Sequence, residues 1–241
     1  MNWPVLACVL VAGGCGRISF DPGVGPGGDA RTDGVLAVDG PATSDLLLHF
    51  AFETADLRVD SAVNPHDGSC NACPTPTAGR VGNGAALFDG TQCLEIPGTR
   101  ALQPAAFTFG AWLRPRVVHT GTVFGRTRDG ATTTGNSWEI WVDVTPASNI
   151  AVRAGRAIGP GGTGEWHHYA GTYDGSTFNA YVDGVFYQTH QTALGAYTPD
   201  DLAIGCDLNV GTLVQKFDGG IDDVRLYGRV LSAAEIAVLA Q

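Results

Sequence analysis

The sequence predicts an all-β fold, a sandwich of two antiparallel sheets, and three observations lead to this prediction. In residues 164–189, GEWHHYAGTYDGSTFNAYVDGVFYQT, every second residue from Phe178 to Val182 is apolar, and a period of two residues is the pattern of a β-strand. The 34 glycines and 13 prolines supply the turns that many short strands need. Only one segment, near the C-terminus, has a helical pattern. A hydrophobic content of 44% is enough for one core between two sheets.

Two Asp-Gly pairs divide residues 164–189 into strands. Asp174-Gly175 follows an apolar and aromatic run that begins at Trp166, and Asp183-Gly184 precedes a second apolar run. Asp174-Gly175 marks a turn, and Asp183-Gly184 is the preferred pair for a two-residue hairpin turn, because both central positions of that turn need a positive φ. We therefore expect a meander of neighbouring antiparallel strands.

The one predicted helix lies close to the C-terminus. Ser232 is a suitable N-cap, and Glu235 three residues later completes the pattern of a capping box. Ile236 and Leu239 form an apolar stripe, so we expect this helix to pack against the sandwich.

Several segments resemble, in order, the strands of laminin-G-like or concanavalin A-like jelly-roll domains. Residues 164–189 are similar to the WHHVAGTYDG and YVDG signature of that family. The other similar segments are LLLHFAFE (46–53), RVGNGAALFDG (80–90), CLEIP (93–97), AFTFGAWLRP (106–115), LAIG (202–205) and FDGGIDDVRLYGRVLSAAEIAVL (217–239). The resemblance implies a concanavalin A-like jelly-roll β-sandwich with one short C-terminal helix over residues 45–241.

The first 44 residues differ in composition from the rest. Residues 1–14 are mostly apolar and end in small residues before Cys15, which resembles a bacterial lipoprotein signal peptide and implies a lipid on Cys15. An ordinary secretion signal cleaved nearby is the alternative. Residues 15–44 are rich in Gly, Pro and Asp, so we expect a disordered tether. The resemblance to a lipoprotein signal peptide implies that the protein is exported and lipid-anchored in the bacterial envelope. Gly16 after the cysteine, by its similarity to lipoproteins of diderm bacteria, implies sorting to the outer membrane or the cell surface.

The remaining four cysteines are an even number, as in proteins that form disulfides in an oxidising compartment. Four cysteines allow three pairings, of which we favour Cys70 with Cys73 and Cys93 with Cys206. A zinc site is the alternative for the CNAC segment, although the chain has no second CxxC.

The family resemblance also implies a structural calcium ion near the first and last strands. The matching positions are Glu53, Asp60, Asn64 and Asp222, with backbone carbonyls around residues 89–90 as further ligands. Asp222 has the strand parity of Val224, so we expect it to face the core, where a carboxylate needs a partner. A hydrogen-bonded polar network without metal is the alternative.

One segment suggests a ligand site. Alternation along SWEIWVDV (137–144) places Trp141 and Glu139 on the face opposite to Trp138, so Trp141 is expected to point outward or into a groove. An indole beside carboxylates suits the stacking of a sugar, and Arg126 lies just before this segment as part of a rim. The candidate ligand-binding residues are therefore Trp141, Glu139 and Arg126. The alternative is that a neighbouring loop covers Trp141.

Catalysis is not expected. Glu139 and Asp143 lie four residues apart on one predicted strand, hence about 13 Å from each other, which is too far for a retaining glycosidase pair. His167 and His168 are adjacent, so their side chains point to opposite faces of a strand and are expected to be structural.

The net charge of −10 and the absence of a basic stripe argue against nucleic acid as a partner. We expect a non-catalytic cell-surface module that binds a glycan or a surface protein. A structural or adhesive envelope protein without a small-ligand site is the alternative, and a glycoside hydrolase of this fold comes third.

Overall fold

The computed structural model describes residues 43–117, 119–126, 138–143, 149–153, 157–159, 163–194, 201–209 and 212–241. The predicted signal peptide, Cys15 and nearly all of the predicted tether lie outside these residues. Among the described residues, no helix has the length and apolar character needed to cross a bilayer.

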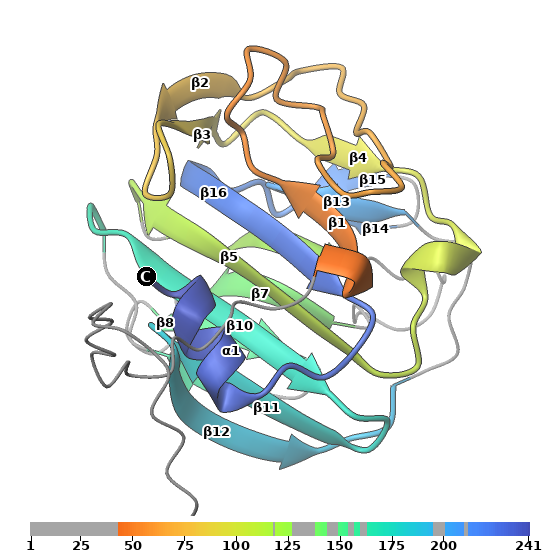
Figure 1. The fold of residues 1–241 in the computed structure, drawn as a ribbon. Coiled ribbons are helices and arrows are strands. Elements are labelled where there is room, and N and C mark those ends of the chain that lie inside the picture. Colours follow the sequence, from red (N-terminus) through yellow and green to blue (C-terminus); the bar gives the residue numbers. More distant parts are fainter. Residues whose placement is uncertain are drawn as a thin grey trace, which may run out of the picture. The chain divides into compact units, whose positions relative to one another are not determined.

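The structure is a β-sandwich, as the sequence predicts (Figure 1). The strands are β1 (Leu46–Phe50), β2 (Thr75–Ala78), β3 (Gly84–Asp89), β4 (Leu94–Ile96), β5 (Phe107–Pro115), β6 (Gly121–Arg126), β7 (Trp138–Asp143), β8 (Asn149–Arg153), β9 (Ala157–Gly159), β10 (His167–Tyr173), β11 (Thr177–Val182), β12 (Val185–Gln191), β13 (Leu202–Ile204), β14 (Asp207–Asn209), β15 (Thr212–Val214) and β16 (Asp218–Tyr227). The helices are the 3-10 turns η1 (Thr43–Asp45) and η2 (Arg100–Leu102) and the α-helix α1 (Ala233–Leu239).

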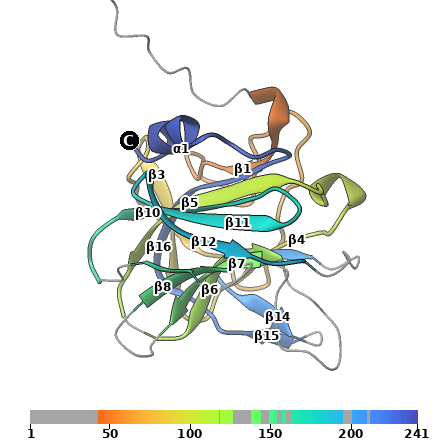
Figure 2. The same ribbon diagram turned by 90° about the horizontal axis from the view of Figure 1, so that it is seen from below.

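Two sheets form the layers. The larger sheet has eight strands in the order β12-β11-β10-β5-β16-β3-β2, with β1 also paired to β16, and the smaller sheet has six in the order β4-β13-β6-β7-β8-β9. The hairpin β14-β15 is separate. Figure 2 shows α1, the larger sheet and the smaller sheet as successive layers.

The core lies between the inner faces of the two sheets. Alternate residues of β5, namely Phe107, Phe109, Ala111 and Leu113, pack there against Trp138 and Ile140 of β7. The rings of Phe109 and Trp138 are 4.5 Å apart between centroids. Burial of such aromatic side chains supplies much of the stability of a sandwich.

Helix α1 covers part of the outer face of the larger sheet. Its N-terminus has the predicted capping box, in which the Ser232 hydroxyl accepts the Glu235 amide and the Glu235 carboxylate accepts the Ser232 amide. Ile236 and Leu239 pack with Tyr181 of β11 and other residues of a second, smaller core.

Both favoured disulfides are present. Cys70 pairs with Cys73, and Cys93 pairs with Cys206 across 113 residues of sequence. The second bond joins the residue before β4 to the turn after β13, and these two strands are hydrogen-bonded neighbours in the smaller sheet.

Gly205, in the turn after β13, occupies a position that only glycine fits. Its φ is +78°, and a Cβ there would lie 2.2 Å from a ring carbon of Phe88. Its amide donates to the Val123 carbonyl and its carbonyl accepts the Phe217 amide, so this turn joins β6 to the start of β16.

Candidate ligand-binding site

Strand β7 divides its side chains between the core and the outer face of the smaller sheet. Trp138, Ile140 and Val142 belong to the core cluster, whereas Trp141 is partly exposed on the opposite face. This is the orientation that the alternation in the sequence predicts.

Glu139 lies on the same outer face as Trp141 but is buried, with 2% of its surface exposed. Its Oε2 accepts the Thr122 hydroxyl of β6 at 3.1 Å, and the same hydroxyl oxygen lies 3.4 Å from Oε1 of Gln215. Thr122 is the cross-strand partner of Trp141, so Glu139, Trp141 and Gln215 are all neighbours of this one threonine.

Arg126 does not join this group. Arg126 of β6 is the cross-strand partner of Trp138 of β7, so its side chain lies on the core-facing side of the sheet, and it is 1% exposed. Its Nη1 donates to the Leu102 carbonyl at 3.3 Å, which ties η2 to the sandwich. The structure therefore separates Arg126 from Trp141 by the thickness of the sheet, because Arg126 is a strand residue and not part of a loop before β7.

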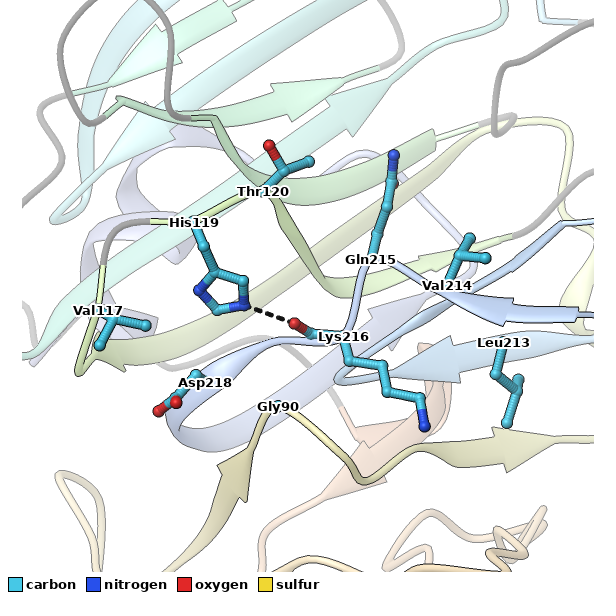
Figure 3. A pocket seen from close by; sticks show the side chains of 9 residues that line it. All are labelled: Gly90, Val117, His119, Thr120, Leu213, Val214, Gln215, Lys216 and Asp218. Atoms are coloured by element: carbon cyan, nitrogen blue, oxygen red, sulfur yellow. Dashed lines mark hydrogen bonds between the residues drawn. The ribbon is translucent and has the colours of Figure 1, made fainter.

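A shallow hollow of about 560 Å³ lies next to His119 and Thr120, just before β6 (Figure 3). It is formed by the segment between β5 and β6, by β15 and its connection to β16, and by the turn after β3. The lining residues are Gly90, Val117, His119, Thr120, Leu213, Val214, Gln215, Lys216 and Asp218.

The charged groups of the hollow are paired within the protein. Lys216 Nζ donates to the Thr91 carbonyl at 2.6 Å, and Arg116 Nε donates to Asp218 at 2.6 Å, which raises the pKa of the Arg116 guanidinium. His119 Nε2 donates to the Lys216 carbonyl at 2.6 Å, a bond drawn in Figure 3. Besides these engaged charged groups, the hollow presents the Gln215 amide and the Thr120 hydroxyl next to apolar side chains.

Gln215 connects the hollow to Trp141. It lines the hollow, is exposed, and contacts Thr122, the neighbour of Trp141. Its backbone has a φ of +46°, which is unusual for a residue with a side chain and is often found at binding sites. Sequence reasoning missed Gln215, His119 and Lys216, because no local pattern indicates that the connection between β15 and β16 folds beside β6.

The predicted calcium ligands Glu53 and Asp60 accept backbone amides. Asp60, which is buried, accepts the amides of His49, Ala62 and His66 at 2.8, 2.9 and 2.7 Å. Glu53 accepts the amides of residues 83 and 84.

Asn64 is exposed beside this loop and lines a small hollow with Leu47 and Val63. Within the described ranges no group of three acidic, histidine or cysteine side chains could hold a metal ion. The donor contacts do not fit the predicted site, and calcium binding stays a prediction.

Asp222 does not face the core, and this corrects the expectation from its parity. A bulge between Asp222 and Arg225 inserts one residue into β16, where Asp223 has a φ of +49°. Asp222 therefore pairs with Trp112 on the outer face of the larger sheet, while Val224 still enters the core.

Asp222 is nevertheless fully buried. Its Oδ2 accepts the amides of Arg80 and Val81 at 2.8 and 2.9 Å, and its Oδ1 has no hydrogen-bond partner. The Arg80 guanidinium lies over the ring of Trp112, the cross-strand partner of Asp222, 4.5 Å from the ring centre. Burial raises the pKa of the Asp222 carboxyl to about 6, against the lowering effect of the two amides.

Asp223 belongs to a charged network next to it. Its Oδ1 lies 2.7 Å from His49 Nε2 and 3.0 Å from Arg225 Nε. Burial opposes ionisation of Asp223, but the bonds from His49 and the charge of Arg225 hold its pKa below the usual range. Asp222 and Asp223 are thus adjacent carboxylates with opposite pKa shifts.

His167 and His168 lie on opposite faces, as expected. His167 Nδ1 is 2.8 Å from Oδ2 of Asp183, and the His168 amide donates to Oδ1 of the same residue. The His168 ring packs beside Trp112, and burial lowers its pKa to about 4. These contacts connect β10 to the turn between β11 and β12.

Comparison with known proteins identifies the family. The family model of the concanavalin A-like lectin/glucanases superfamily matches residues 88–237. No curated protein sequence matches the chain.

Several solved structures share the fold. Domain 4 of AbnA, a GH43 extracellular arabinanase from Geobacillus stearothermophilus solved with arabinotriose, is 22% identical with a TM-score of 0.61, over 82% of this chain and 98% of that one. The binding domain of Paraclostridial Mosquitocidal Protein 1 is 13% identical with a TM-score of 0.63, over 82% of this chain and 52% of that one. The botulinum neurotoxin type G receptor binding domain is 16% identical with a TM-score of 0.52, over 82% and 51%.

The jelly-roll topology agrees with these similarities, and the family model spans more than half of the sequence. The chain therefore belongs to the concanavalin A-like lectin/glucanases superfamily.

Proposed function

We propose that this chain is a non-catalytic binding module that recognises carbohydrate on the outer face of the smaller sheet. The observation that carries the proposal is the partly exposed Trp141, whose cross-strand partner Thr122 contacts Gln215 in the lining of the hollow. An indole offers a flat apolar surface for the face of a sugar ring, and amide and hydroxyl groups suit its hydroxyls. Domain 4 of the arabinanase, which has the same fold, was solved with arabinotriose.

Buried Glu139 positions the site and does not act as an acid or base. Its carboxylate is 2% exposed and accepts the Thr122 hydroxyl, so it orients the threonine next to Trp141. A glycosidase needs two carboxyl groups about 5 to 9.5 Å apart around the scissile bond. Asp218, the acidic residue of the hollow, is paired with Arg116, so the arrangement favours binding over hydrolysis.

The two disulfides suit an exported protein. We propose that a lipid on Cys15 anchors the domain to the bacterial envelope, at the outer membrane or cell surface, where it meets glycans or a surface protein. Palmitate labelling of the wild type and of Cys15→Ala in a bacterial host tests this anchor, and label retained in the variant would refute it.

A second candidate, a structural or adhesive envelope protein, is favoured by strand β12. All seven residues of β12 are exposed, and none of them is Asp, Glu, Lys or Arg. The strand forms one edge of the larger sheet. Val185, Phe186 and Tyr187 are 68%, 52% and 47% exposed. Exposed apolar edge strands are sites of strand pairing with another chain.

Glycan-array binding of two matched variants separates the candidates. Trp141→Ala should lower glycan affinity at least tenfold, and Phe186→Ala, which removes an exposed aromatic side chain from the other sheet, should leave it unchanged. An array without signal, together with self-association lost in Phe186→Ala, would refute carbohydrate binding and support the adhesive role. Hydrolysis of a bound polysaccharide would overturn both.

A further inference from the structure

The two disulfides differ in their access to solvent. Cys93 and Cys206 are 3% and 0% exposed and pack with Ala203 beneath the β14-β15 hairpin. In contrast, Cys73 is exposed and Cys70 is partly buried, with Cys70 packed against the main core. A reductant in solution can therefore reach one sulfur of the Cys70–Cys73 bond, and it cannot reach the other disulfide without opening the fold.

They also differ in what they hold together. The bond between Cys93 and Cys206 closes a loop of 113 residues, whereas Cys70 and Cys73 are three residues apart. Cross-linking constrains an unfolded chain more as the closed loop lengthens, so the small loop contributes less to stability.

The backbone around the small loop has its own attachments. Ser69 and Glu95 exchange two amide-to-carbonyl hydrogen bonds of 2.8 Å, and the Cys93 amide donates to the Ala72 carbonyl at 3.3 Å. On the other side, Thr75 begins strand β2, which pairs with β3. The segment is thus held to the sheets on both sides without the sulfur bridge.

From these differences we propose that Cys70–Cys73 is a thiol-exchange site that opens and closes reversibly with dithiols while Cys93–Cys206 stays closed. The thiolate of a dithiol attacks the Sγ of the exposed residue Cys73, the disulfide bond breaks, and Cys70 leaves as a thiolate. The second thiol of the reductant then attacks the mixed disulfide. The products are two protein thiols and the oxidised reductant, so two electrons pass from the dithiol to the protein.

A monothiol does not complete this reaction at the same concentration. Once it is joined to Cys73, the Cys70 thiolate is held three residues away and attacks the same sulfur, which restores the original bond and expels the monothiol. The partner is therefore a dithiol, such as dithiothreitol or a protein with a CxxC pair.

Differential alkylation of the full chain tests the proposal. Free thiols are first blocked with N-ethylmaleimide; graded dithiothreitol follows, new thiols are labelled with iodoacetamide, and peptides are quantified by mass spectrometry. We expect Cys70 and Cys73 to reach half labelling at a dithiothreitol concentration at least tenfold lower than Cys93 and Cys206. An equal concentration of mercaptoethanol should give less than a tenth of that labelling.

Variants test whether opening leaves the fold intact. Cys70→Ser/Cys73→Ser should keep the near-ultraviolet circular dichroism of the wild type and lose less than half as much in Tm as Cys93→Ser/Cys206→Ser. Reduction of both disulfides at one concentration, earlier reduction of Cys93–Cys206, or loss of tertiary structure in the first variant would overturn the proposal.

Discussion

Replacement of Asp222 by Asn should stabilise the protein at neutral pH. The folded state raises the pKa of this carboxyl from its ordinary 3.8 to about 6 because burial penalises the charge. A raised pKa means that the contribution to stability is complete below pH 3.8 and is lost as the pH rises through 6. Since each pKa unit corresponds to about 1.4 kcal/mol, the charged carboxylate costs about 3 kcal/mol at pH 7.

Asparagine keeps the oxygen that accepts the amides of Arg80 and Val81 and carries no charge. Urea unfolding of wild type and Asp222→Asn, each at pH 4 and pH 7.5 with EDTA present, measures the difference. We expect the variant to gain about 2 kcal/mol on the wild type between these two pH values, because part of the cost is already present at pH 4. A difference that is constant with pH, or a variant that is less stable at pH 7.5, would refute the reasoning.

Asp174→Asn is the matched control, because the fold lowers the pKa of Asp174 whereas it raises the pKa of Asp222. Asp174 lies in an exposed turn, where hydrogen bonds from the amides of Thr177 and Ser176 lower its pKa. Its charged form is the one that the fold favours, so the variant should lose stability relative to the wild type as the pH rises from 3 to 5.

The remaining predictions concern four other features. Burial lowers the pKa of His168 to about 4, so the free energy of unfolding of the wild type should fall by about 3 kcal/mol between pH 6.5 and pH 4. His168→Phe should not show this loss in acid titrations followed by fluorescence. Cys93→Ser/Cys206→Ser should lower the free energy of unfolding by about 4 to 5 kcal/mol, measured by urea titration, because a loop of 113 residues opens. Gly205→Ala should cost about 3 kcal/mol or more in the same assay, through its contact with Phe88 and its positive φ. Addition of calcium tests the predicted calcium site: a rise in Tm that EDTA reverses would confirm it, and an unchanged Tm would mean that the carboxylates of Glu53 and Asp60 serve only the backbone amides that they accept.

Gly175→Ala separates the two causes of the loss expected for Gly205→Ala, which are the positive φ and the contact with Phe88. Gly175 also has a positive φ, +106°, but a Cβ there would meet nothing within 4 Å. It should therefore show the backbone cost alone, about 1 to 2 kcal/mol. Equal losses in the two variants would mean that Phe88 moves aside without cost.

The fold could be predicted because its signals are local. The Asp-Gly turn at residues 183–184 joins β11 to β12, and the capping box at Ser232 begins α1 as expected. Alternation in β7 also placed Trp141 outside the core. Each of these features depends on residues within a few positions of one another.

The rest depends on contacts between distant segments. The bulge at Asp223 adds one residue to β16, so Asp222 lies on the outer face of the sheet although Val224 faces the core. The alternation of side chains along a strand continues only as far as such a bulge. The prediction that Arg126 forms part of a rim around Trp141 is wrong because β6 extends to Arg126, and nothing in the sequence near this residue indicates that. The hollow that Gln215 lines needs the β15-β16 connection, about 75 residues beyond Trp141 in the chain.

The position of β16 has a consequence for how the protein folds. This strand is central in the larger sheet, paired with β5 and β3 as well as β1, yet it ends at Tyr227, near the end of the chain (Figure 1). During synthesis, β1, β3 and β5 must wait for their common neighbour, and such long-range pairing is slow to form. The larger sheet therefore forms only after synthesis has reached Tyr227, so β3 and β5 remain without the strand that lies between them until then.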